Sequence, residues 1–179
     1  GDVAVGLLLQ RPGVQVDLQD SQGLTALMLA ARRGSPEVFE PLLAARPDLN
    51  LSSAEGKTAL MILAERSRVP NAMAHACLLA LLQHGRKHGM PELNLQCSDG
   101  RTALMLAVVN GCVPSVESLL ALGAAVDVGL QDAGGETARS LSSLSARRAG
   151  AAGVFRRLRG LLPAPEFGHS SLLLSDGVL

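Results

Sequence analysis

Side chains that could bind a metal are closest together at Cys77, His84 and His88. Thiolate sulfur and imidazole nitrogen are ligands that zinc prefers. The three stand seven and four residues apart, which fits no common zinc motif, and we expect Gly85 to break any helix between the two histidines. We therefore interpret Cys77 as a packed core residue and the histidines as solvent-facing side chains near a loop.

Other patterns of catalytic chemistry are absent from the sequence. No glycine-rich stretch is followed by the lysine and hydroxyl residue of a phosphate-binding loop, and no G-x-S-x-G occurs. The carboxylates Glu55, Glu65, Asp99 and Glu136 are spread along the chain, as expected of solvated positions rather than of a general acid–base pair. We predict that the protein is not an enzyme and uses no metal or cofactor.

Composition restricts the partners and the compartment. Sixteen basic residues balance sixteen acidic ones, and there are three Phe but no Trp or Tyr, which argues against nucleic acid as a partner. Three cysteines form no paired spacing, which favours a reducing, intracellular location, cytoplasmic or nuclear. No apolar run approaches the ~20 residues that a membrane span needs.

The elements that position these side chains repeat. The string TALM occurs at 25–28, 58–61 and 102–105, with a fainter TARS at 137–140. Two further series keep a similar spacing: the polar residues Asp17, Asn50, Asn94 and Asp127, and the leucines Leu9, Leu42, Leu81 and Leu119. The base period is 33, and one interval of 44 holds two insertions, at 68–76 and 86–92. Three series in phase indicate a repeat architecture.

Each unit has the same local chemistry. A turn with glycine, such as Gln22-Gly23, precedes a threonine that can cap a helix start, and an apolar run follows. In the best unit Gly34 ends this helix, Ser35 caps a second one and Pro36 opens it. Two short helices cannot bury their apolar faces alone, so the units must stack.

These motifs resemble the ankyrin-repeat family, whose signature is T-P-L-H-x-A at period 33. The matches are TALMLA at 25–30 and 102–107 and TALMIL at 58–63. Alanine replaces the signature proline, and Met28, Met61 and Met105 replace its histidine, so these positions are expected to pack in the core. Pro41 falls inside a predicted second helix, where it removes one backbone bond.

The resemblance implies an all-α solenoid of stacked helix-turn-helix units with short β-hairpin-like fingers. We assign 1–163 to the array, as a half unit 1–19, units of about 20–52, 53–96 and 97–130, and a degenerate unit 131–163; 164–179 is a non-repeat tail. The initial half unit suggests a piece of a longer array. The last unit is rich in arginine (Arg147, Arg148, Arg156, Arg157 and Arg159), which indicates a polar cap or a basic docking patch.

The resemblance also implies that partners bind on the concave face, at finger tips and at the ends of the first helices. The implied finger residues are Ser21, Gln22, Leu24, Glu55, Lys57, Asp99, Arg101 and Glu136, and the implied helix-end residues are Arg32, Arg33, Glu65, Arg66, Val109 and Asn110. Long insertions in solenoids often map to binding faces, so Arg86, Lys87 and His88 are added. Arginines in a groove suit carboxylate or phosphate recognition.

Three functions follow from this pattern. The first is a non-catalytic module that binds a partner protein or an extended peptide segment on its concave face, with a partner that is acidic or extended. The alternatives are a substrate-recognition adaptor of a cullin-type ubiquitin ligase and an ankyrin-type inhibitor of a transcription factor. For the adaptor, the segment 141–167 would have to hold a cullin-linked box; it contains a Leu-Pro step but no further match.

Overall fold

The computed structural model describes residues 2–9, 11, 13–66, 72–149 and 162. Within these residues the chain is helical, and the closest approach to a sheet is one isolated bridge between Gln131 and Thr137. The helices, in chain order, are α1 Asp2–Leu9, α2 Ala26–Arg33, α3 Pro36–Ala44, α4 Ala59–Arg66, α5 Ala72–His88, α6 Ala103–Val109, α7 Val113–Leu120, the 3-10 helix η1 Gly123–Ala125 and α8 Ala138–Ala149. The expected all-α class is confirmed.

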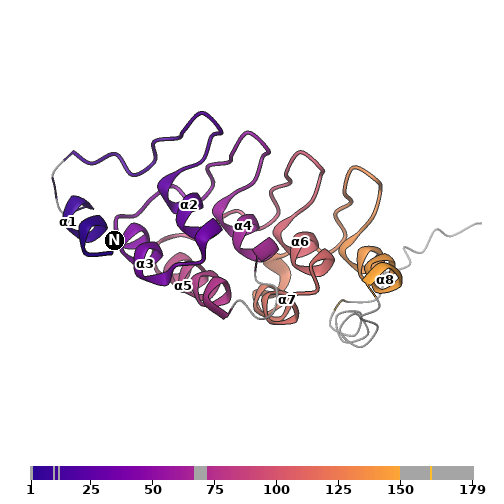
Figure 1. Cartoon of the computed structure of the whole chain (residues 1–179). Coiled ribbons are helices and arrows are strands. Elements are labelled where there is room, and N and C mark those ends of the chain that lie inside the picture. The colour runs from indigo at the N-terminus through magenta and orange to yellow at the C-terminus, as the bar shows by residue number, and fades with distance from the viewer. Residues whose placement is uncertain (1, 10, 12, 67–71, 150–161, 163–179) are drawn as a thin grey trace, which may run out of the picture.

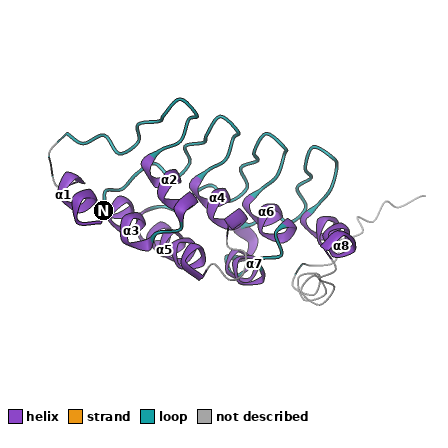
Figure 2. Ribbon diagram, in the orientation of Figure 1, coloured by secondary structure: helices purple, strands orange, loops and turns teal. Residues whose placement is uncertain are grey.

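The helices form two rows (Figure 1). The inner row contains α2, α4, α6 and α8, each packed on the next, and the outer row contains α1, α3, α5 and α7. Within a unit the inner helix also packs on the outer one, as α4 does on α5. Loops that rise from the inner row form the fingers, which stand side by side (Figure 2). This is the stacked helix-turn-helix solenoid that the repeats predict.

Threonine begins each inner helix. The Oγ1 of Thr25 accepts a hydrogen bond from the amide three residues later at 3.2 Å, and the same bond recurs at 3.4 Å for Thr58 and 3.3 Å for Thr102. Thr137 makes it at 3.3 Å in the degenerate unit. A capping hydroxyl satisfies a backbone amide that the helix itself leaves without a partner. The predicted caps are confirmed.

The core lies between the two rows. Met28, Met61 and Met105 are at most 2% exposed, which confirms that they pack instead of tying the turn. The leucines of the outer row, Leu81 and Leu119, are equally buried. Each unit therefore contributes one apolar layer, and each layer is covered only when the next unit stacks on it.

Each finger is a tight turn closed by glycine. In the first, the amide of Gly23 donates to the carbonyl of Asp20 at 2.9 Å, and the amide of Asp20 donates to Leu24 at 3.0 Å. Gly23, Gly56 and Gly100 have φ of 72°, 71° and 71°, a conformation that L side chains rarely adopt. The glycine of each turn pair thus has the backbone conformation that the sequence predicts.

Neighbouring fingers are joined by one repeated backbone hydrogen bond of 2.9 Å. It runs from Ala54 to the carbonyl of Gln22, from Ser98 to Glu55 and from Ala133 to Asp99. In each of these fingers the carbonyl therefore accepts a hydrogen bond from the next finger. The side chains of Gln22, Glu55 and Asp99 remain exposed.

The polar series that closes each unit has a structural role. The side-chain oxygens of Asp17, Asn50 and Asn94 accept hydrogen bonds from backbone amides of the following unit, at 3.0, 2.8 and 2.8 Å. Asn94 also donates to the carbonyl of Ala125 at 3.1 Å. In these three units one short polar side chain thus fixes the distance to the next unit, whereas the Oδ1 of Asp127, the last of the series, accepts from the nearby amide of Gly129 at 2.8 Å.

The outer helix of the longest unit differs from the expectation. We expected Gly85 to break it and 86–92 to form a loop, but α5 continues through Gly85 to His88. A Cβ at this position would lie 3.0 Å from Met90 Sδ and 3.1 Å from Pro91 Cδ. Gly85 therefore allows the returning chain to pack closely on the helix, and this need outweighs the ~1 kcal/mol that glycine costs in a helix. The described part of the first insertion, 72–76, is helical as well.

Two smaller expectations concern α3. Ser35 occupies the N-cap position, but its side chain makes no capping bond; Pro36 opens the helix and Pro41 lies inside it, as predicted.

At the other end of the chain, α8 packs on α6. The arginine side chains of the last unit and the tail fall outside the described residues. The domain boundaries stay a prediction.

Candidate functional site

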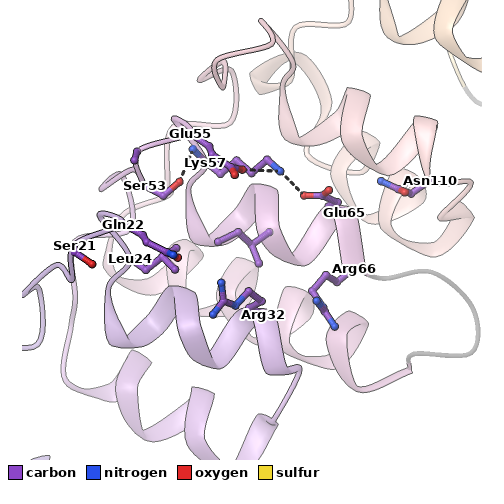
Figure 3. Close-up of a pocket in the computed structure, with 12 residues that line it drawn as sticks. Ser21, Gln22, Leu24, Arg32, Ser53, Glu55, Lys57, Glu65, Arg66 and Asn110 are labelled. Atoms are coloured by element: carbon purple, nitrogen blue, oxygen red, sulfur yellow. Dashed lines mark hydrogen bonds and ion pairs between the residues drawn. The ribbon is translucent and has the colours of Figure 1, made fainter.

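A hollow of about 730 Å³ lies between the fingers and the inner helices (Figure 3). Its lining residues, which define what we call the finger groove, are Ser21, Gln22, Leu24, Arg32, Ser53, Ala54, Glu55, Lys57, Ile62, Glu65, Arg66 and Asn110. They come from two successive fingers and from the ends of α2, α4 and α6. More than half of the residues that the resemblance implied as partner contacts are brought together here.

The floor of the finger groove is apolar. Leu24 and Ile62 line it, with 7% and 6% of their surfaces exposed. Leu24 was expected as an exposed tip contact, but the turn holds it inward, since its amide donates to Asp20 Oδ1 at 2.8 Å. A side chain seated on this floor would cover apolar surface and lose little hydration.

One wall of the groove is an ion-pair cluster. Lys57 Nζ lies 3.0 Å from Glu65 Oε2 and 3.2 Å from Glu55 Oε2. Burial alone would lower the pKa of Lys57, but the hydrogen bonds and charges of the two carboxylates outweigh it and raise that pKa. The ammonium stays charged and neutralises part of the acidic wall. It also joins the finger to the last turn of α4.

The opposite lip is basic (Figure 3). Arg32 lies in the last turn of α2, Arg66 is the last residue of α4, and both side chains are exposed. Neither guanidinium has an ion-pair partner among the described residues. Asn110 lies near this lip and donates its side-chain amide to the carbonyl of Leu106 at 2.9 Å. The lip therefore offers two forked cationic donors to an outside carboxylate or phosphate.

Arg101 is used differently from these two arginines. Its Nε lies 3.3 Å from Asp132 Oδ2 in the next finger. Burial would raise the pKa of Asp132, but the amides of Glu136 and Gly134 and the Arg101 guanidinium outweigh it and lower that pKa. Arg101 thus holds two fingers together, one unit beyond the finger groove. Asp99 is exposed on its finger, and Glu136 is half-buried on the next.

The remaining predicted contacts lie elsewhere. Arg33 lines a separate hollow of about 470 Å³ with Leu29 and Val38, between α2 and α3. Val109 packs against the core. Arg86, Lys87 and His88 form the last turn of α5, in the outer row, rather than a loop at the groove. The structure does not bring these five residues to the finger groove.

The candidate metal cluster is not assembled. Cys77 is fully buried, and burial together with Glu37 and Glu40 raises the pKa of its thiol to about 11. The rings of His84 and His88 lie 4.5 Å apart on one turn of α5, and burial and nearby cations lower the pKa of His84. Among the described residues no three potential ligands come together.

Two lining residues were missed. Ser53 Oγ accepts a hydrogen bond from the amide of Lys57 at 3.3 Å and so shapes the finger. Ile62 lies four residues after Thr58, which is the position of Leu29 and Leu106 in the neighbouring units. Leu29 lines the separate hollow between α2 and α3 instead, so a count from each threonine does not by itself place this position at the finger groove.

Comparison with known proteins agrees with this architecture. A family model described as ankyrin repeats (3 copies) matches residues 1–87 and 47–132. A comparison with curated proteins gave no significant match. In the part of the chain that the structure describes, no helix has the length and apolar character needed to cross a bilayer. With most of its length matched and its units stacked as described, the chain belongs to the ankyrin-repeat family.

Proposed function

We propose that this protein is a non-catalytic interaction module whose finger groove holds one extended segment of a partner protein. Ankyrin repeats are in general protein–protein interaction modules. The supporting observation is the groove itself, where an apolar floor lies between a partly neutralised acidic wall and a basic lip. Such a mixture suits a peptide with both apolar and charged side chains.

We expect side chains of the groove, rather than its backbone groups, to recognise the partner segment. The finger carbonyls of Gln22, Glu55 and Asp99 already accept hydrogen bonds from the next finger. Consequently these carbonyls are not offered to a partner in the way that a free sheet edge offers its backbone groups. The exposed side chains beyond the ladder remain for recognition. The groove reaches from Ser21 to Asn110, so a linear segment would cross three units.

Photo-crosslinking in cells tests this proposal. A photoreactive phenylalanine replaces Gln22 at the groove or, as the matched control, Gln83 on the exposed side of α5. We expect a discrete adduct with another protein from position 22 and none of the same mass from position 83. An adduct that forms from position 83 alone would contradict the proposal.

The cysteines support the expected compartment. Cys77, Cys97 and Cys112 are all buried as thiols. Buried thiols without disulfides suit a reducing environment, so we propose an intracellular site of action. The narrower roles, ligase adaptor and transcription-factor inhibitor, stay predictions; most of the segment 141–167 lies outside the described residues.

A further inference from the structure

We propose that the segment held by the finger groove is acidic. In this inference, which rests on the proposed function, an apolar side chain covers Leu24 and Ile62, and nearby carboxylates bind Arg32 and Arg66.

The charges in the groove are unevenly satisfied. Glu55 and Glu65 share the ammonium of Lys57, at 3.2 and 3.0 Å. Arg32 and Arg66 have no carboxylate partner among the described residues, and both are exposed beside the hollow. The unsatisfied charge at the groove is therefore positive. A bound carboxylate would complete a bidentate pair that the described residues do not supply.

The fold does not require these arginines. A cation at a helix C-terminus is stabilised by the helix dipole, which gives Arg32 and Arg66 a possible structural role. The equivalent helix α6 ends instead at Val109 and the neutral Asn110, which satisfies the carbonyl of Leu106 with its side chain. A stable inner helix in this chain thus needs no terminal cation, and the two arginines are free to serve recognition.

Net charge alone does not select the acidic group. Lys57 neutralises only one of the two carboxylates beside it, so the wall of the groove keeps about one negative charge. A phosphate, with a charge of about −1.5 to −2, would be repelled more strongly by this wall than a carboxylate, but it would also be attracted more strongly by Arg32 and Arg66. Glutamate or aspartate is the acidic residue assigned here, and a matched phosphoserine peptide distinguishes it from a phosphorylated residue.

Fluorescence polarisation with the full chain tests the inference. The probes are labelled Gly-Ser-based peptides with a central Leu and two Glu at one to four residues from it. Matched peptides carry Gln, Lys or phosphoserine in place of Glu, or Ser in place of Leu. We expect the best Leu–Glu peptide to bind at least about tenfold tighter than its Gln and Ser counterparts and to weaken as salt rises.

Protein variants complete the test. Arg32→Glu combined with Arg66→Glu should weaken the Leu–Glu peptide at least about tenfold and strengthen the Lys peptide, a gain that misfolding cannot produce. Arg33→Glu, on the same helix end but outside the groove, should change affinity less than about twofold.

Equal or tighter binding of the Gln, Lys or phosphoserine peptide would overturn the inference, and so would the absence of binding by every peptide. In either case an adduct from position 22 in the crosslinking experiment would leave the proposed function standing. Loss of that adduct would remove both.

Discussion

The ammonium of Lys57 lies 3.0 Å from Glu65 Oε2, eight residues further along the chain. The pair joins a finger to the end of α4, and Glu55 completes the cluster at 3.2 Å. About a fifth of the lysine side chain is exposed. The cluster therefore fixes the shape of one groove wall and lowers its negative charge, while Arg32 and Arg66 on the other side have no carboxylate partner in the part of the chain that the structure describes.

Removing one carboxylate of this cluster should improve binding of an acidic peptide. Glu65→Gln keeps the size of the side chain but removes one negative charge beside the basic lip. We expect the affinity for the Leu–Glu peptide to rise by about threefold. The free energy of unfolding should fall by less than about 1 kcal/mol, because Glu65 is partly exposed.

Glu37→Gln, on the exposed outer helix α3, is the matched control and should leave peptide affinity unchanged. Polarisation and urea unfolding measure the two effects. A lower affinity of Glu65→Gln for the acidic peptide would contradict the assigned charge balance.

Glycine at the finger turns should matter through stacking as well as conformation. A Cβ on Gly100 would lie 2.6 Å from the amide nitrogen of Ala133, whereas a Cβ on Gly135 meets nothing within 4 Å. Both residues have positive φ, at 71° and 77°. Alanine at either position costs about 1 kcal/mol of backbone strain. Gly100→Ala should lose about 2 kcal/mol more, because the fingers must also separate.

Thermal unfolding compares the two variants. The extra loss in Gly100→Ala corresponds to a Tm about 4–8 °C below that of Gly135→Ala. Equal Tm values for the two variants would show that finger stacking adds nothing to stability.

Features of the fold that depend on residues close together in the chain could be predicted from the sequence. Threonine caps, turn glycines and one apolar layer per unit all follow from neighbours in the chain, so the repeat was visible in TALM and its copies. The series of Asp17, Asn50 and Asn94 was also visible. The role of this series in joining units could not be predicted from the sequence, because each side chain binds a backbone amide 31–42 residues away.

Long-range packing explains the rest. Gly85 reads as a helix breaker until Met90 and Pro91 are seen against it. The resemblance implied Arg101 as a partner contact like Arg66, but the next finger places Asp132 beside it. Such pairings depend on how neighbouring units stack. The repeat pattern of a sequence does not give the distances between side chains of different units.

The polar side chains that join units should be worth measurable stability. Asn94 accepts from the amide of Asp127 at 2.8 Å and donates to the carbonyl of Ala125 at 3.1 Å. Asn94→Ala removes both bonds and should lower the free energy of unfolding by about 1–2 kcal/mol. Gln83→Ala, exposed on α5, is the control and should change it by less than about 0.5 kcal/mol. Urea unfolding measures both changes in the free energy of unfolding. Equal effects of the two substitutions would contradict the role of Asn94 in joining the units.

Stability should fall as the solution is acidified below neutral pH. Burial lowers the pKa of His75 from 6.5, against a smaller opposite effect of Glu117, and Ser115 Oγ lies 3.5 Å from its Nδ1. Because the folded pKa is depressed, the unfolded chain binds the proton first. The contribution of His75 to stability is complete above pH 6.5 and is lost as pH falls through the folded pKa.

His75→Asn should therefore flatten the decrease of Tm between pH 7.5 and 5. His84, whose pKa is lowered too, leaves a residual slope that the double variant with His84→Asn should reduce further. A steeper slope in His75→Asn would contradict the assigned direction of the shift.

Recognition on the concave face is tested by hydrogen exchange of the full chain with and without the Leu–Glu peptide. We expect slower exchange of amides in 21–24, 53–57, 65–66 and 109–110, where the finger groove lies, and unchanged exchange in the outer segment 79–88. Slower exchange confined to 79–88, with the fingers unaffected, would contradict recognition on the concave face.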